Sequence, residues 1–382
     1  MFFMIKIRSS YYHIRDDKWK ELHFCECCTS VITMKICYFG IYNSNFGRNK
    51  VYISGLKKNG VEIIECRDNS RGLLKFWRLW KKHRLITKNG GYDFMIVGYP
   101  GHLIVPFAKL ISRKKVIFDA LCTLYEGEVI SRGKFKFNLF MRLWIRLIDW
   151  LAAKSADFIL VETNKQKEYF LKRFGLETDK VARVFTGVDE EIFHPIPNIP
   201  KRNKFTVVFR GKFLPEAGVR YVIGAAEILK NEGINFLIIG NGYLVGEIGK
   251  QLDESKVENI EWIRENLPTE RLRNLMLQCH VSLGQFENHV RLNRTIPHKA
   301  FESLVMGLPY ITGRAEGVQE LLADGKDCLM VNLADANDLA AKILLLKNNP
   351  ELRQNIAENG RRLYENNLTN RILGREILKL LS

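Results

Sequence analysis

The sequence lacks several features that would narrow its function at once. None of its apolar runs approaches the ~20 residues that a membrane-spanning helix needs. It contains no Asp-x-Asp motif, a pattern in which paired aspartates hold a divalent metal. Its eight cysteines provide no second Cys-x-x-Cys and no nearby histidine pair, so they do not complete a zinc-binding set. Neither a membrane span nor a metal site is therefore indicated.

The beginning of the chain also lacks the features of a signal peptide. Charged residues run through residues 1–20, without a compact apolar segment or a small-residue cleavage site. The scattered cysteines are typical of buried reduced thiols and predict a cytoplasmic protein. Residues 1–33 fit neither helical nor strand periodicity. We interpret them as an N-terminal extension of unclear role, either a start-site artefact upstream of Met34 or a small accessory segment.

Positive charge is present in excess. Lysine and arginine number 59 against 42 aspartate and glutamate residues, which gives a formal net charge of +17. Such an excess favours anionic partners, namely nucleic acid, an acidic membrane surface or phosphorylated substrates. The length of 382 residues exceeds what one hydrophobic core usually supports, so we expect two domains.

Short runs rich in Val, Ile and Phe alternate with helical stretches in both halves of the chain. Unalternating apolar runs are typical of parallel strands, so this order predicts an α/β protein with two doubly wound, Rossmann-like domains. A proline-rich segment that begins at Pro195 separates the halves. We expect domains over residues 34–195 and 196–382 that face each other across a cleft, and the last helix can return to the first domain. The expected strands are 35–41, 61–66, 94–98, 115–119, 157–162, 181–185, 205–209, 235–239, 259–263, 280–284, 309–312 and 328–331.

Two helical stretches in the first half, residues 73–86 and 134–154, combine aromatic and basic residues. Between Arg71 and Asp149, lysine and arginine number 16 against five aspartate and glutamate residues. We expect the apolar stripe of the second stretch to pack on the sheet, while the basic faces are either simply solvated or meet an anionic membrane. That stripe consists of Phe137, Phe140, Met141, Trp144, Leu147, Ile148 and Leu151.

Ligands of doubly wound domains bind at the carboxyl ends of the strands, so the segments after each strand are the candidate sites. Three such segments of the second half are rich in glycine or cations, which can hold a phosphate. Each glycine-containing segment can alternatively be a simple tight turn. The candidates are Arg210, Gly211 and Lys212 after the first strand, Gly240 and Gly242 after the second, and Arg291 and Arg294 after the fourth.

The segment 294–313, RTIPHKAFESLVMGLPYITG, predicts a helix that Pro297 opens and Gly307 ends. Lys299 and Glu302 lie three residues apart on one face of this helix. They are either a solvated ion pair or a ligand-binding pair. In the second case Glu302 accepts hydrogen bonds from two vicinal hydroxyls, as on a ribose, and Lys299 meets the neighbouring phosphate. The basic segments nearby favour a nucleoside diphosphate as the ligand.

These segments resemble the donor-binding half of the retaining GT-B glycosyltransferases of family 4. The resemblance lies in IPHKAFESLVMGLPYIT, RGKFLPEAGV, GNG and EGVQELLADGKDCLMVNLADANDLAAKI, while VARVFTGVDEEIFHP resembles the hinge of that family. It extends from about Met34 to the C-terminus. The resemblance implies that Glu302 holds the donor ribose, that Lys212 and Lys299 meet phosphate, and that Glu320 lies near the transferred sugar or its phosphate.

Two positions depart from the pattern of that family. The Glu-Lys-Gly triplet of the family is Glu216-Ala217-Gly218 here, and Arg294 replaces the first glutamate of its two-glutamate motif. We interpret the chain as a divergent branch rather than an inactive enzyme. The cation that neutralises the leaving phosphate is left open between Lys212, Arg294 and Lys299.

The segments after the strands of the first half are expected to hold the acceptor. Asp119 is our first candidate for a contact to the acceptor hydroxyl or the sugar. His102 is the second, although a lone histidine after a tight turn is more often structural. The other acceptor-side candidates are Asn43, Arg48, Tyr99 and Glu126. Because there is no Asp-x-Asp motif, we expect helix dipoles and cations to neutralise the pyrophosphate, with no metal and no cofactor.

The sequence thus predicts a retaining glycosyltransferase that moves a sugar from a nucleoside-diphosphate sugar to an acceptor hydroxyl, in surface glycan, polysaccharide or glycolipid assembly. Retention is implied by the resemblance alone. We expect a glycan or lipid-linked acceptor and peripheral attachment to an anionic membrane at its cytoplasmic face. The alternatives are a sugar-nucleotide 2-epimerase on the same fold and a basic nucleic-acid-binding protein. No nucleic-acid-binding module is recognisable, so nucleic acid is not an expected partner.

Overall fold

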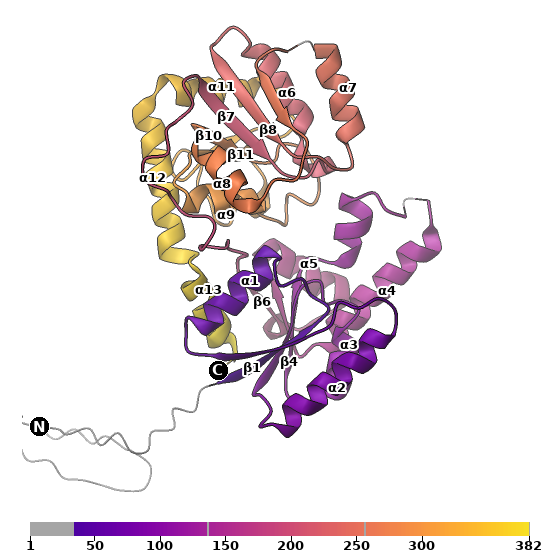
Figure 1. Ribbon diagram of the computed structural model, residues 1–382. Coiled ribbons are helices and arrows are strands. Elements are labelled where there is room, and N and C mark those ends of the chain that lie inside the picture. Colours follow the sequence, from indigo (N-terminus) through magenta and orange to yellow (C-terminus); the bar gives the residue numbers. More distant parts are fainter. Residues whose placement is uncertain (1–33, 136, 256, 382) are drawn as a thin grey trace, which may run out of the picture. The chain divides into compact units, whose positions relative to one another are not determined.

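The computed structural model describes residues 34–135, 137–255 and 257–381. The expected extension, with Cys25, Cys27 and Cys28, lies outside the described residues. The described chain folds into two lobes, each built on a six-stranded parallel sheet with helices packed against it (Figure 1). This confirms the predicted α/β fold with two Rossmann-like domains. We call residues 34–195 the N-terminal lobe and residues 196–369 the C-terminal lobe.

The sheet of the N-terminal lobe has the strand order β2-β1-β3-β4-β5-β6. The order reverses between β1 and β3, so the loops after these strands meet at a switch point, where ligands of such sheets bind. Helix α1 lies on one face of the sheet, while α2, α3 and α4 lie on the other (Figure 1). The strands are β1 (Lys35–Gly40), β2 (Glu62–Arg67), β3 (Phe94–Val97), β4 (Val116–Leu121), β5 (Phe158–Val161) and β6 (Val181–Arg183). The helices are α1 (Gly47–Lys57), α2 (Leu74–Lys88), α3 (Val105–Ile111), the π-helix η1 (Glu126–Ser131), α4 (Leu139–Ser155), α5 (Asn164–Phe174) and the short η2 (Thr178–Lys180).

The sheet of the C-terminal lobe has the order β12-β11-β10-β7-β8-β9, with its switch point between β7 and β10. Its strands are β7 (Phe205–Arg210), β8 (Ile234–Ile239), β9 (Ile260–Ile263), β10 (Val281–Leu283), β11 (Tyr310–Gly313) and β12 (Leu329–Val331). Its helices are η3 (Pro215–Ala217), α6 (Val219–Ile228), α7 (Val245–Ser255), α8 (Thr269–Leu277), α9 (His298–Val305), α10 (Glu316–Gln319), α11 (Ala336–Asn348) and α12 (Pro350–Asn367), followed by α13 (Asn370–Leu381). Every predicted strand is present, with ends within two residues of the prediction.

Helix α4 differs from the prediction in its start and in its buried face. It begins at Leu139, because the side chain of Asn138 accepts a hydrogen bond from Met141 N at 2.9 Å and caps the first turn. Most of the predicted inward stripe is exposed, including Phe140 at 74% and Trp144 at 49%. The expectation that this stripe packs on the sheet is therefore wrong.

The face of α4 that does pack inward is the one with small side chains. Ile145, Ile148, Ala152 and Ala153 are buried, and the two alanines let the helix approach the sheet closely. Apolar periodicity cannot distinguish the two faces, because both carry apolar residues. Among the described residues, no helix is long and apolar enough to cross a membrane.

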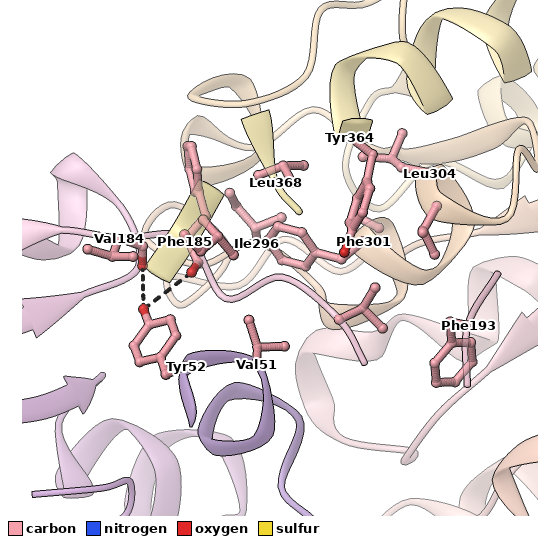
Figure 2. Packing of buried hydrophobic residues seen from close by; sticks show 14 of the residues in the cluster. Val51, Tyr52, Val184, Phe185, Phe193, Ile296, Phe301, Leu304, Tyr364 and Leu368 are labelled. Carbon is pink, nitrogen blue, oxygen red and sulfur yellow. Dashed lines mark hydrogen bonds between the residues drawn. The ribbon is translucent and has the colours of Figure 1, made fainter. Parts of the chain in front are cut away.

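One continuous apolar cluster connects the two lobes through the segment after β6 (Figure 2). Tyr52 of α1 donates hydrogen bonds from its hydroxyl to the carbonyl oxygens of Val184, at 3.0 Å, and Phe185, at 3.2 Å. On the other side of this segment the cluster continues into Phe301 of α9 and Tyr364 of α12. The lobes are thus joined by a packed hinge as well as by the proline-rich linker.

The last helix, α13, packs against α1 of the N-terminal lobe (Figure 1). The two helices touch backbone to backbone at a pair of glycines. A Cβ atom added at Gly374 would lie 2.2 Å from the carbonyl carbon of Gly55, and one added at Gly55 would lie 2.1 Å from the carbonyl oxygen of Asn370. Only glycine permits this approach without moving one helix away from the other.

We expect Gly374→Ala to lower the free energy of unfolding by about 1–3 kcal/mol, because the added methyl group forces α13 away from α1. Gly246→Ala in α7 is the matched control, since no atom lies within 4 Å of a Cβ added there. The control should stabilise the protein by about 0.5–1 kcal/mol through helix propensity alone. Urea denaturation of both variants measures the difference, and equal shifts would contradict the close helix packing.

Candidate functional site

Helix α9 carries Lys299 and Glu302 into the interior of the C-terminal lobe. It begins after Pro297, and Gly307 follows its last turn with a φ of 65°, as the sequence predicted. Lys299 is 6% exposed and Glu302 3% exposed. The two side chains are therefore not a solvated ion pair, and each contacts its own partners.

Glu302 forms an ion pair with Arg210, the last residue of β7. Its Oε1 atom also lies 3.0 Å from Nδ1 of His298. Burial lowers the pKa of His298 to about 3, with a further contribution from the charge of Arg210, so the imidazole is neutral at pH 7. Burial also lowers the pKa of Arg210 to about 10, which leaves this guanidinium charged at neutral pH.

Lys299 lies at the switch point of the same sheet. Its Nζ atom donates to the carbonyl oxygen of Gly284 at 3.0 Å and lies 3.7 Å from the centroid of the Phe209 ring. Burial lowers the pKa of Lys299 well below its usual value, and the nearby charge of Arg210 acts in the same direction. Among the described residues no carboxylate pairs with this amine. A bound anion would supply the missing counter-charge.

The glycines that were predicted to approach a ligand lie against the backbone of a neighbouring loop. A Cβ atom at Gly240 would lie 1.9 Å from the carbonyl oxygen of Gly211, so the loops after β8 and β7 are in backbone contact. Gly242 likewise leaves no room for a side chain beside Phe213 N, at 2.7 Å. The side chain of Lys212 is exposed on this loop and forms no hydrogen bond or ion pair with any residue that the structure describes.

Arg294 contacts the N-terminal lobe directly. Its guanidinium donates to Oε1 of Glu126 from Nη2 at 2.6 Å and from Nε at 3.0 Å. Glu126 is fully buried, and its other oxygen accepts from Gln166 of α5 at 2.8 Å. A donor-side and an acceptor-side candidate, predicted separately, thus form one ion pair between the lobes.

Arg291 makes a second contact between the lobes. Its Nη1 atom donates to Oε1 of Glu216 at 2.7 Å and lies 2.7 Å from the hydroxyl oxygen of Ser131, at the end of η1. Ser131 donates a hydrogen bond to the same Glu216. Glu216 of the divergent Glu-Ala-Gly triplet therefore binds an arginine of its own lobe and a serine of the other.

Glu320 makes a third contact between the lobes. Its carboxylate accepts hydrogen bonds from the backbone nitrogens of Asn164, at 2.6 Å, and Lys165, at 2.8 Å. These are the first residues of α5, where a negative charge interacts favourably with the helix dipole. In this structure the side chain of Glu320 is bound to the N-terminal lobe and does not contact α9.

Asp119 and Arg48 form an ion pair in the interior of the N-terminal lobe. Arg48 Nε lies 2.7 Å from Asp119 Oδ1, and both side chains are fully buried. Burial raises the pKa of Asp119, an effect that Arg48 partly offsets. Arg48 also donates to the carbonyl oxygen of Val184 at 3.0 Å and to the hydroxyl of Thr186 at 3.1 Å. The pair connects β4 to the hinge, and in this structure neither side chain is open to an acceptor.

The other acceptor-side candidates divide into buried and accessible residues. His102 is buried with Nε2 at 2.9 Å from the carbonyl oxygen of Cys122, and burial lowers its pKa to about 4, so it is neutral at pH 7. Tyr99 is half-buried and packs its ring against Phe46, with 5.1 Å between the centroids. Asn43 is exposed in the loop after β1.

The start of α1 meets α9 of the other lobe. A Cβ atom at Gly47 would lie 2.7 Å from Nε2 of His298, so a larger residue here would have to displace the imidazole of the donor-side helix. His298 was not identified from the sequence, although its i, i+4 spacing from Glu302 was available as a signal. Glu162, which accepts from Ile296 N at 3.0 Å, had no such signal, because its partner is 134 residues away.

The structure therefore brings together a cation-containing interior site in the C-terminal lobe and a set of buried ion pairs between the lobes. Among the described residues, no three His, Cys, Asp or Glu side chains are grouped so as to hold a metal ion. The described cysteines, Cys37, Cys66, Cys122, Cys279 and Cys328, are buried free thiols, as the sequence predicted.

The chain is similar to known glycosyltransferases in sequence and in fold. Residues 189–363 match the family model described as glycosyl transferases group 1. An uncharacterized glycosyltransferase of Methanocaldococcus jannaschii is 25% identical over 231 residues, which cover 55% of this chain and 62% of that protein. The chitobiosyldiphosphodolichol beta-mannosyltransferase of Kluyveromyces lactis is 24% identical over 354 residues, which cover 83% of this chain and 76% of that protein.

Solved structures agree in fold. Anabaena HepE in complex with UDP matches with a TM-score of 0.67 and 14% identity, covering 91% of this chain and 99% of that one. The sucrose-phosphate synthase of Thermosynechococcus elongatus matches with a TM-score of 0.70 and 13% identity, covering 91% of this chain and 98% of that one. The predicted GT-B arrangement of two Rossmann-like domains is confirmed. Residues 189–363 thus match the glycosyl transferases group 1 model, within a chain that has the GT-B fold.

Proposed function

We propose that the protein is a glycosyltransferase that moves a sugar from a nucleoside-diphosphate sugar to an acceptor hydroxyl with retention at the anomeric carbon. The observation that carries this proposal is the buried amine of Lys299 at the switch point of the C-terminal sheet, where it forms no ion pair with a carboxylate of the described chain. A phosphate of the donor is the counter-charge that this position favours. Glu302, on the same helix, holds the ribose.

The names of similar proteins support this class of reaction. They include a capsular polysaccharide biosynthesis glycosyltransferase of Staphylococcus aureus and the Kluyveromyces lactis beta-mannosyltransferase, whose name contains a diphosphodolichol-linked sugar. Several structural neighbours were solved with UDP, and one with UDP-glucose. A role in glycan or polysaccharide assembly, with a glycan or a lipid-linked acceptor, is the setting that these relatives favour.

The remaining residues have the following roles in the proposal. Lys212, at the tip of the loop after β7, reaches the leaving phosphate, and helix α9 contributes the positive end of its dipole. The Arg294–Glu126 pair holds the lobes closed over the donor. Asp119 acts through Arg48 on the hinge and is a positioning residue, as is His102. Glu320, through its contact with α5, fixes the loop that faces the transferred sugar.

The two rival functions are less favoured. A sugar-nucleotide 2-epimerase would release an epimer without any acceptor, and the similar proteins that carry a functional name are glycosyltransferases. A nucleic-acid-binding role rests on net charge alone. We further propose peripheral attachment to an anionic membrane at its cytoplasmic face, through the basic, aromatic helices of the N-terminal lobe.

We expect Glu302→Gln to weaken the binding of the matching nucleoside diphosphate about 10- to 100-fold, because a neutral amide accepts hydrogen bonds from ribose hydroxyls less strongly than a carboxylate does. Calorimetry with UDP and GDP, beginning with the nucleotide that binds the parent protein, measures the change. Glu365→Gln is the matched control, since Glu365 forms an exposed ion pair with Arg361 on α12. Parental affinity in Glu302→Gln would place the ribose elsewhere.

Nucleotide binding should also take up a proton at Lys299. The pKa of this amine is depressed in the free protein, and a bound phosphate raises it. At pH values between the pKa of Lys299 in the free protein and its pKa in the complex, binding adds a proton to the amine. The affinity is therefore highest below the pKa of the free protein and falls as the pH rises through this range. Calorimetry in two buffers of different ionisation enthalpy measures the uptake. Lys299→Met should abolish it, and an unchanged uptake in that variant would assign the proton to another group.

Sugar transfer should proceed undiminished in EDTA, because cations and helix dipoles replace a metal in the proposed site. Incubation with a nucleoside-diphosphate sugar and a candidate acceptor in EDTA, followed by NMR of the product, tests the metal and the stereochemistry together. The anomeric configuration of the donor should be preserved in the product. Activity that returns only with manganese would overturn the metal-free mechanism, and an inverted product would overturn retention.

A further inference from the structure

A small pocket opens on the N-terminal lobe between the segment after β4, helix α4 and helix α5. Its volume is about 140 Å³, several times the ~30 Å³ share of a water molecule in the liquid, so it can accommodate a phosphoryl group. It belongs to none of the contacts between the lobes described above. Its lining residues are Thr123, Tyr125, Arg146, Asp149, Tyr169, Arg173 and Phe174.

Two arginines, Arg146 and Arg173, line this pocket, and Arg142 lies next to it. Arg142 and Arg146, one turn apart on α4, both donate to the hydroxyl oxygen of Tyr125, at 2.8 Å and 3.1 Å. Arg173 enters from the last turn of α5. None of the three forms an ion pair with a carboxylate in the part of the chain that the structure describes. Guanidinium groups that share one neutral oxygen repel each other, and an anion between them removes the repulsion.

The single carboxylate in the pocket, Asp149, is already engaged. Its two oxygens accept hydrogen bonds from the backbone nitrogens of Leu124, at 2.8 Å, and Tyr125, at 3.0 Å. Burial raises its pKa to about 7, so at neutral pH it carries only part of a negative charge. Burial alone would raise the pKa of Tyr125, but Arg142 and Arg146 lower it, as a positive field does. The pocket is therefore positive overall.

The exposed apolar face of α4 begins at the edge of this pocket. Phe140, Leu143, Trp144, Leu147 and Leu151 are exposed and recur at helical spacing. At 100° per residue, Arg146 lies between this apolar face and the buried face of the helix, while Arg142 falls within the sector of the buried residues. The helix thus presents an apolar surface to its surroundings, with the guanidinium group of Arg146 along one border of that surface.

We propose that this pocket binds the phosphoryl group of a membrane lipid, while the apolar face of α4 inserts into the surrounding bilayer. Guanidinium groups bind phosphate oxygens in a planar, two-pronged geometry, and the phosphoryl group of a lipid lies at the level where an inserted amphipathic helix keeps its cations. The arginines match the phosphoryl group of such a lipid, and the apolar face matches its hydrocarbon surroundings. A soluble phosphate or a nucleic acid would match only the arginines.

The pocket adjoins the contacts between the lobes. Tyr169, one wall of the pocket, packs its ring under the guanidinium of Arg294 at 4.2 Å, and Arg294 pairs with Glu126. Tyr125 of the pocket directly precedes Glu126 in the segment after β4. This part of the inference rests on the proposed glycosyltransferase function: the bound lipid phosphate is the carrier of the acceptor.

Co-sedimentation with vesicles tests the proposal on the full chain. Phosphatidylcholine vesicles carry either a polyprenyl phosphate or phosphatidylglycerol, at matched surface charge. We expect the parent to bind the phosphomonoester vesicles about tenfold more tightly, because the two arginines that line the pocket favour the more highly charged and accessible phosphoryl group. Equal binding to both vesicles would overturn the pocket, and a calorimetric affinity for inorganic phosphate as high as that for the lipid would make it a free-phosphate site.

Matched variants separate the pocket from the apolar face. The pair Arg146→Gln and Arg173→Gln should remove the preference for the phosphomonoester and leave the weaker binding to phosphatidylglycerol. The pair Lys250→Gln and Arg362→Gln removes the same charge from exposed positions of the C-terminal lobe and should keep the preference. The pair Leu143→Ser and Trp144→Ser should abolish binding to both vesicles, whereas Leu110→Ser on α3 should not. If the pocket variant kept the preference, or if its control lost it, the assignment of the pocket would be contradicted. If the Leu143 and Trp144 variant still bound the vesicles, or if Leu110→Ser did not, the role of the apolar face would be contradicted.

Binding of UDP or GDP to the same variants separates this inference from the proposed function. All of them should bind the nucleotide like the parent, because the pocket and α9 lie in different lobes. A parent that binds nucleotide but shows no lipid preference would overturn the inference and leave the proposed function intact. A parent that prefers the phosphomonoester but binds no nucleotide would overturn the function and leave the lipid site.

Discussion

The packed hinge after β6 is the feature on which the rest of the structure depends. Its carbonyl groups accept hydrogen bonds from Tyr52 and Arg48 of α1, and its apolar side chains continue into α9 and α12. A chain segment held on both sides in this way fixes the carboxyl ends of both sheets relative to each other. The contacts of the cleft, between Arg294 and Glu126 or between Gly47 and His298, require that geometry.

The buried charged side chains described above differ in whether each is paired with an opposite charge. Buried ion pairs add little net stability, because the cost of removing two charges from water offsets much of their attraction. The pairs between the lobes therefore specify the closed arrangement more than they stabilise the fold. Lys299 is different, because its buried amine forms no ion pair with a carboxylate of the described chain, and the charge of Glu216 only partly offsets the effects of burial and of Arg210. This asymmetry distinguishes a binding position from a structural contact in the C-terminal lobe.

The N-terminal lobe shows a second asymmetry, between the two faces of its helices. On one side of the sheet, α1 is covered by α13, with glycines at the point of closest approach. On the other side, α4 leaves its aromatic residues exposed and sets Arg146 along their border. The lobe can therefore bind an amphipathic partner on the side of α4, whereas the side of α1 is already covered.

The elements of the fold could be predicted from local sequence patterns. Apolar runs located every strand of the described chain, and Pro297 and Gly307 located the ends of α9, because these signals act over a few neighbouring residues. The patterns also selected Lys299 and Glu302 as a pair, but left open whether they are exposed. Three features could be seen only in the folded chain: both residues are buried, Arg294 reaches Glu126 across 168 positions, and the aromatic side of α4 faces outward. Local periodicity records that a helix has an apolar face, whereas which face is covered depends on residues distant in the sequence that pack against it.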